Sequence, residues 1–133
     1  MKKKLSWAAG AVLITLALIG GALFAQKPGI TRTVLTRKDI SVPGREAVVA
    51  RVEIAPNAYV GRHTHPGEEI SYILEGEGEI LIDGQPPLKV KAGDSFIVPA
   101  GAKHDAHNTT SKPLRLVGVY IVDKSKPMAT PAP

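Results

Sequence analysis

Three histidines and an acidic residue stand in two short, turn-rich motifs where they could bind a metal ion. In the first motif, residues 61–76, His63 and His65 are two positions apart. In an extended strand both imidazoles therefore point to one face, while Thr64 points to the other. This arrangement could chelate a cation, because two nitrogen donors are presented side by side.

An acidic side chain after the following Pro-Gly turn could complete a ligand set of nitrogen and oxygen atoms. Glu68 and Glu69 both stand where the chain returns toward the histidines. Because the turn breaks the two-residue alternation of the strand, spacing alone does not choose between them. Imidazole and carboxylate ligands suit divalent ions, and Mn, Fe, Ni, Cu and Zn are all candidates.

The second motif, residues 93–108, supplies the third histidine. Its glycines and proline permit tight turns on either side of a short strand. If His104 begins a regular strand, its side chain shares a face with that of Asn108, whereas Asp105 and His107 point the opposite way. We therefore expect His104 to join the metal ligands and His107 to have a structural role.

The elements that position these residues are short β-prone runs separated by turn residues, and beyond the N-terminal segment no window keeps a helical period. Ile82 is followed directly by Asp83-Gly84, which is the strongest hairpin signal in the chain. Regularly spaced short strands predict an all-β sandwich or barrel. The predicted strands are residues 31–36, 47–54, 71–74, 78–82, 88–90, 95–98 and 114–122.

The two motifs resemble those of the cupin family. The first family motif, G(x)5HxH(x)3-4E(x)6G, and the second, G(x)5PxG(x)2H(x)3N, are matched here at every position except the first glycine. That position holds Asn57, which tolerates positive φ better than most residues. The matching residues are His63, His65, Glu69 and Gly76 in the first motif, and Gly93, Pro99, Gly101, His104 and Asn108 in the second.

The resemblance implies a small double-stranded β-helix, or jelly-roll barrel, of two facing antiparallel sheets over residues 45–122. It also implies one divalent metal ion inside one end of the barrel, and it favours Glu69 over Glu68 as the acidic ligand. The implied ligands are His63, His65, Glu69 and His104.

Three neutral imidazoles and one carboxylate leave a divalent ion with a net charge of about +1 and, in octahedral geometry, two open positions. Such a set resembles non-haem oxygenase sites, so we expect a metal-dependent enzyme of the dioxygenase type that acts on a small organic molecule. Isomerase and lyase activities also occur in the family. Beyond the ligands, only Tyr72 and His107 are candidates for proton transfer. The expected cavity lining is Ile73, Ile82, Phe96 and Val98.

Two other functions fit the same residues. A binding module would hold a metal or a small ligand without turnover, as the short chain and the lack of an evident catalytic base suggest. A purely structural barrel would not use the histidines at all. A homodimer is expected in each case, because an isolated small barrel has strand edges to protect.

The N-terminal segment predicts export. Three lysines at positions 2–4 precede an uncharged, apolar stretch at residues 5–25, the pattern of a signal peptide cleaved after Ala25. The stretch is also long enough for an uncleaved membrane anchor. Both interpretations place the remainder outside the cytoplasm, in the periplasm or the extracellular space.

The amino-acid composition excludes several classes of protein. The chain has 133 residues, a length typical of one domain, and it contains no cysteine, which excludes disulfide scaffolds and thiolate metal sites. Its 17 basic and 12 acidic side chains give a net charge of +5, of which the leader lysines contribute +3. No basic cluster remains for nucleic acid. We expect residues 26–44 to form an N-terminal strand and linker, and the Pro-rich tail, residues 123–133, to be disordered.

Overall fold

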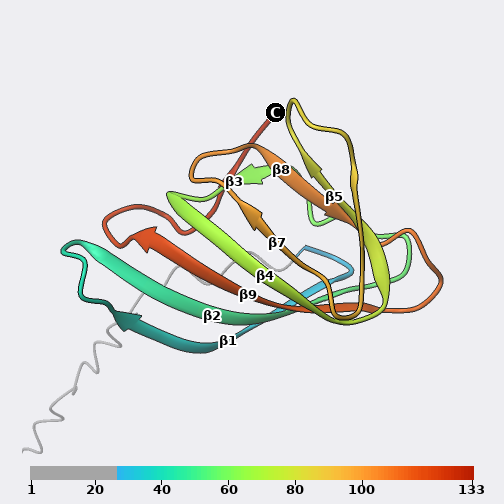
Figure 1. The fold of residues 1–133 in the computed structure, drawn as a ribbon, viewed down its shortest axis with the longest axis horizontal. Coiled ribbons are helices and arrows are strands. Elements are labelled where there is room, and N and C mark those ends of the chain that lie inside the picture. The colour runs from blue at the N-terminus through green and yellow to red at the C-terminus, as the bar shows by residue number, and fades with distance from the viewer. Residues whose placement is uncertain (1–26) are drawn as a thin grey trace, which may run out of the picture.

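A computed structural model describes residues 27–133, which form two antiparallel five-stranded sheets (Figure 1). The prediction of an all-β barrel of two antiparallel sheets is confirmed. The predicted signal peptide or anchor, residues 1–25, lies outside the described residues. Within the described part of the chain, no helix is long and apolar enough to cross a membrane.

Both sheets mix strands from distant parts of the chain. The larger sheet has the order β1 (Ile30–Asp39), β2 (Arg45–Ile54), β9 (Leu114–Asp123), β4 (Gly67–Glu75) and β7 (Ser95–Val98). The smaller sheet has the order β10 (Thr130–Pro131), β3 (His63–Thr64), β8 (His104–His107), β5 (Glu77–Ile82) and β6 (Leu88–Lys91).

The core lies between the sheets and follows from period-two burial. Along β9 every second residue is buried, and β2 is its antiparallel partner over all ten residues of each strand. Ile54, Ile73 and Leu114 are fully buried in this core. Each such side chain contributes about 1.5–3 kcal/mol of burial free energy, so the paired long strands form the stable base of the barrel.

Strand β4 begins four residues earlier than the predicted run at 71–74, and this extension decides which glutamate faces inward. A Cβ atom on Gly67 would lie 1.8 Å from the carbonyl oxygen of Ile121 on β9, so only glycine permits this approach. Because the strand is already regular at Gly67, alternation turns Glu68 outward and Glu69 inward.

Asn57 takes the place that the resemblance assigns to a glycine. It has a φ of 57° and is the only non-glycine residue with positive φ among residues 27–133. Asparagine is enriched in this left-handed region. The turn is therefore kept despite the substitution.

The prediction that the C-terminal tail is disordered is wrong. Residues Thr130 and Pro131 form β10 and pair with Thr64 and His63 of β3. The side chain of Met128 is buried, in a cluster with Val48, Ala50, Tyr120 and Val122. Prolines indicated disorder in the sequence, but proline is tolerated on an edge strand, and β3 offers that edge.

Candidate metal centre

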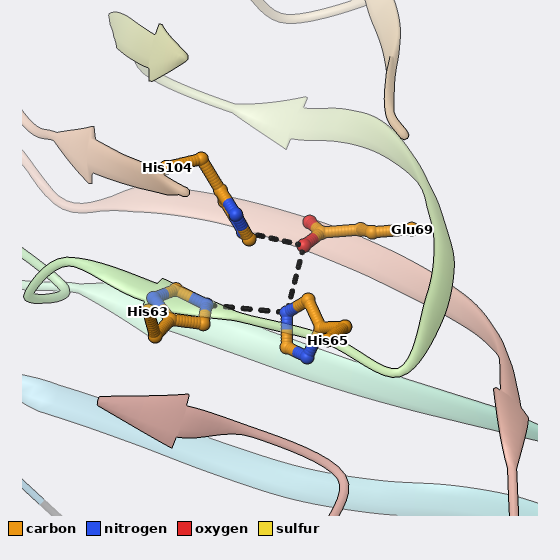
Figure 2. A group of neighbouring side chains, drawn as sticks. All are labelled: His63, His65, Glu69 and His104. Carbon is orange, nitrogen blue, oxygen red and sulfur yellow. Dashed lines mark hydrogen bonds and ion pairs between the residues drawn. The ribbon is translucent and has the colours of Figure 1, made fainter. Parts of the chain in front are cut away.

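The four residues implied as metal ligands converge from three strands (Figure 2). His63 lies on β3, directly opposite His104 on β8, while His65 follows β3 and Glu69 lies on β4. One donor atom from each lies within 4.8 Å of every other. Glu69 is only 6% exposed and belongs to this cluster, whereas Glu68 is exposed on the outer face.

The separations between donor atoms match those of ligands around one ion. His63 Nε2 lies 3.1 Å from His65 Nε2. Glu69 Oε2 lies 3.2 Å from His65 Nε2 and 3.3 Å from His104 Nε2. Atoms about 2.1 Å from a shared ion, in neighbouring octahedral or tetrahedral positions, are separated by roughly 3.0–3.4 Å.

Backbone carbonyls fix the orientation of all three imidazoles. His63 Nδ1 donates to Gly61 O at 2.6 Å, and His104 Nδ1 donates to Ala102 O at 2.9 Å. His65 Nδ1 donates to Met128 O at 2.7 Å. With the proton on Nδ1, each Nε2 carries a lone pair, and these lone pairs are directed into the cluster.

Among residues 27–133, the inward-facing nitrogens find no adequate hydrogen-bond partners. The Nε2 atoms of His63 and His65 face each other as two acceptors. His104 Nε2 is within ion-pair distance of Glu69, yet this buried atom makes no hydrogen bond of acceptable geometry to the part of the chain that the structure describes. Buried polar atoms are rarely left in this condition, and a cation among them would satisfy all four donors. The residues therefore fit a divalent metal ion.

The electrostatics favour the ligand form of the site. Burial would raise the pKa of the Glu69 carboxyl, but the imidazoles of His104 and His65 and the Ser71 hydroxyl, 2.6 Å away, outweigh burial and hold that pKa well below its usual range. Burial, reinforced by the neighbouring His104, lowers the pKa of His63 to about 4. Glu69 is thus ionised and His63 neutral at neutral pH.

His104 behaves differently from His63. Burial opposes its charged form, but the Glu69 carboxylate and the Ala102 carbonyl outweigh burial and raise its pKa. In the metal-free protein this imidazole therefore retains a proton more readily than His63. A cation and a proton would compete for its Nε2, so metal binding is coupled to pH.

A cavity of about 370 Å³ adjoins the cluster and is lined by all four of its residues. This volume suits a small organic molecule. Of the four predicted lining residues only Phe96 reaches the cavity. Ile73 and Val98 are instead fully buried in the core, and Ile82 packs against the core as a partly buried residue.

Neither predicted candidate for proton transfer lies at the cavity. Tyr72 is 50% exposed on the outer face of β4. The ring of His107 stacks on Tyr59, with centroids 3.8 Å apart and planes inclined by 5°. The structural role expected for His107 agrees with this packing.

Sequence reasoning missed several residues that support the cluster, among them Asp105 and Tyr120. Asp105 lines the cavity, and its Oδ1 accepts a hydrogen bond from Gly61 N at 2.8 Å, which steadies the carbonyl that orients His63. The ring of Tyr120 lies edge-on to His65, with centroids 4.9 Å apart. Burial and the Glu69 charge raise the pKa of Tyr120.

One sequence signal could have indicated Tyr120. Gly118 stands two positions earlier on the same face of β9, and a Cβ atom there would lie 2.6 Å from the Tyr120 hydroxyl. A glycine inside a strand indicates that another group approaches closely. Asn108 has a structural role: its amide nitrogen donates to Ile54 O at 3.0 Å and to Lys112 O at 2.7 Å.

Comparison with known proteins identifies the family. Residues 50–120, more than half of the chain, match the family described as "Cupin domain". The chain therefore belongs to the cupin family.

Two proteins of similar sequence and one of similar fold can be compared with this chain. An oxalate-binding protein of Thermotoga maritima is 39% identical over 74 residues, 55% of this chain and 60% of that protein. An acireductone dioxygenase of Rhodopseudomonas palustris is 34% identical over 83 residues, 56% of this chain and 50% of that enzyme. A Klebsiella pneumoniae protein with a double-stranded β-helix domain superposes with a TM-score of 0.64 at 22% identity, covering 76% of this chain and 84% of the other. The chain thus spans only about half to three fifths of the length of these two sequence relatives.

Proposed function

We propose that this cupin protein is a metal-dependent enzyme of the dioxygenase type that acts on a small organic molecule. One divalent metal ion is bound by four residues: His63, His65, Glu69 and His104. The observation that carries the proposal is the convergence of four buried or half-buried donor atoms within 4.8 Å, beside a cavity. Similarity to an acireductone dioxygenase supports the oxygen chemistry. The donor set accommodates Mn, Fe, Ni, Cu or Zn.

Each residue has a separate task. The three imidazoles and the carboxylate of Glu69 hold the ion, which when bound supplies Lewis acidity and, if it is redox-active, reactivity toward O2. Ser71 holds the Glu69 carboxylate through a hydrogen bond of 2.6 Å. Apolar residues including Phe96 restrict water in the cavity and contact the carbon skeleton of a ligand.

The proposal is tested by O2 uptake and product analysis with a panel of aromatic, thiol and sugar compounds. We expect the wild type to consume O2 or a compound of the panel, and this activity should be lost in His63→Ala. In metal-depleted wild type, one particular metal should restore it. Glu68→Gln is the matched control, because Glu68 is exposed on the opposite face of β4. A metal-loaded wild type that is inert toward the whole panel would contradict the enzymatic proposal.

A second function is favoured by similarity to an oxalate-binding protein. In that case the metal and the cavity hold a small ligand without turnover. Isothermal titration with oxalate, followed by mass spectrometry of the recovered ligand, separates the two functions. If oxalate binds and is recovered unchanged, the result supports a binding module. If new products are found, the result supports an enzyme.

We also propose that the protein is exported. The proposal is supported by the lysines at positions 2–4 and the uncharged stretch at residues 5–25. Cell fractionation of the full chain, with the N-terminus of the product determined by mass spectrometry, distinguishes a cleaved signal peptide from an anchor. Recovery of the intact chain in the soluble cytoplasm would contradict both.

A homodimer remains a prediction. Apolar side chains are exposed on the outer face of β4 and on its neighbour β7, where Ile70 pairs with Ile97. Association through this face would cover them. Size-exclusion chromatography with light scattering measures the mass directly, and a monomer at high concentration would contradict the prediction.

A further inference from the structure

The C-terminal segment, residues 124–133, lies along the strand that carries the first metal-site histidine. Thr130 pairs with Thr64 and Pro131 with His63, and Ala132 N donates to Arg62 O at 3.0 Å. Figure 1 shows the segment running past β3 to the end of the chain. The tail is thus the edge strand of the smaller sheet, beside the candidate metal centre.

Met128 anchors this segment and contacts the site at the same time. Its side chain is 8% exposed and packs in the apolar cluster that includes Tyr120. Its carbonyl accepts the hydrogen bond from His65 Nδ1 at 2.7 Å. The anchoring side chain therefore determines where the acceptor for His65 lies.

The other two imidazoles do not depend on a distant segment in this way. His63 and His104 each donate from Nδ1 to the carbonyl two residues earlier in the chain. Those acceptors therefore lie close along the chain to the histidines that they orient. The acceptor of His65, by contrast, is 63 residues away and is present only when the tail is docked.

We propose that the C-terminal segment is a positioning element of the metal site, in which the Met128 carbonyl sets the tautomer and ring orientation of His65. The inference rests on the proposed metal-binding function. Four residues of the segment also form part of the cavity wall, so its displacement opens the cavity as well as releasing His65: Pro127, Met128, Ala129 and Pro131.

The test compares full-length variants that differ in whether the tail stays docked. Met128→Asp places a charge in an apolar cluster and expels the anchor, whereas Met128→Leu keeps the packing and the backbone carbonyl. Ala132→Pro is a milder variant, since it removes the N–H that donates to Arg62 but leaves Met128 unchanged. This variant keeps the test decisive if Met128→Asp does not fold.

Two readouts are required. In the metal-free protein, ¹⁵N and ¹H NMR of the imidazoles should show a protected Nδ1 proton on His65 in the wild type and in Met128→Leu. That signal should be lost in Met128→Asp, while those of His63 and His104 persist. In Co²⁺ titrations the Kd should rise about 10- to 100-fold in Met128→Asp, a few-fold in Ala132→Pro, and less than about 3-fold in Met128→Leu.

The two readouts separate failure of this inference from failure of the proposed function. An unchanged His65 signal and Co²⁺ affinity in folded Met128→Asp or Ala132→Pro would overturn the positioning role while metal binding stands. Equal losses in Met128→Leu and Met128→Asp would also overturn it. If the wild type binds no Co²⁺, the proposed function falls, and the NMR comparison alone still decides whether the tail orients His65.

Discussion

The larger sheet contains three strands of ten residues and one of nine, whereas β3 and β10 in the smaller sheet have two residues each. Strands β2 and β9 pair along ten residues, but β3 and β8 pair only at His63 and His104. The smaller sheet nevertheless supplies two of the four candidate metal ligands. The long, regular strands and the short strands thus both contribute to the site, since Glu69 lies on β4 of the larger sheet.

The difference suggests how a small barrel combines stability with chemistry. Long paired strands bury the core and tolerate few changes, while short strands bring side chains together without a long hydrogen-bonded ladder. The residues around the short strands are positioned by hydrogen bonds between distant parts of the chain, such as that of Asp105 with Gly61 and that of Met128 with His65. Substitutions of core side chains should therefore change mainly the free energy of unfolding, whereas substitutions at the metal cluster should change mainly the metal affinity.

The largest effect is expected from removing a core side chain of the larger sheet. Ile73 on β4 and Ile80 on β5 are of the same residue type and equally buried, but only Ile80 borders the cavity. Ile73→Ala should cost about 3–5 kcal/mol of unfolding free energy, because a new void opens in closed packing. Ile80→Ala should cost about 2–3 kcal/mol, because it enlarges an existing cavity. Urea denaturation measures both, and a larger loss in Ile80→Ala would contradict the contrast.

The next effect concerns metal affinity and uses two neighbours on one strand. Glu69→Gln removes the carboxylate that faces the three histidines, so the Kd for Co²⁺ should rise by at least about 100-fold, or about 2.7 kcal/mol. Glu68→Gln changes the exposed neighbour and should leave the Kd unchanged. Calorimetric titration checks both, and equal affinities in the two variants would exclude Glu69 as a ligand.

The metal-free protein should lose stability in acid. The pKa of His63 is 6.5 in the unfolded chain and about 4 in the fold, so the unfolded state binds more protons between these values. The free energy of unfolding should therefore fall, on the order of 2–3 kcal/mol, as the pH drops from 6.5 to 4.

Two other groups modify this pH profile. Glu69, whose pKa is lowered, contributes stability above its unfolded value of about 4.5 that is lost as the pH falls further. His104, whose pKa is raised, contributes stability below pH 6.5 that is lost as the pH rises. Denaturation at several pH values checks the profile, with His63→Asn as control. If the free energy of unfolding of His63→Asn changes with pH as steeply as that of the wild type, His63 is not the cause of the loss of stability in acid.

The smallest effect is expected at Ser71, which supports a ligand without being one. Its buried hydroxyl donates to Glu69 Oε1 at 2.6 Å. Ser71→Ala should weaken metal binding about 10-fold, or about 1.4 kcal/mol, and raise the pKa of Glu69. Ser71→Thr keeps the hydroxyl and should restore most of the affinity. Wild-type affinity in Ser71→Ala would mean that the hydrogen bond does not position the carboxylate.

What the sequence predicted and what it missed have a common physical cause. The histidine pair was predictable because period-two spacing puts both imidazoles on one face, and the turns were predictable from glycine, proline and Asn57. The choice of Glu69 required knowledge of where β4 begins, which depends on Gly67 approaching a strand 54 residues away. Local spacing does not encode such a contact.

The tail is the clearest case of information that is absent locally. Prolines and a short polar run predict disorder when considered alone. The order of residues 124–133 comes from pairing with β3 and from burial of Met128 among residues of β2 and β9. These partners lie near the segment only in the folded barrel, so the contact with His65 could not be predicted either.

The central claim is that four side chains hold one cation, and elemental analysis tests it most directly. Protein should be purified from its natural compartment without added metal salts and compared with a His63→Ala, His65→Ala double variant of confirmed fold. The account predicts about one transition-metal ion per wild-type chain and none in the variant. A metal-free wild type, or an equal metal content in both proteins, would contradict it.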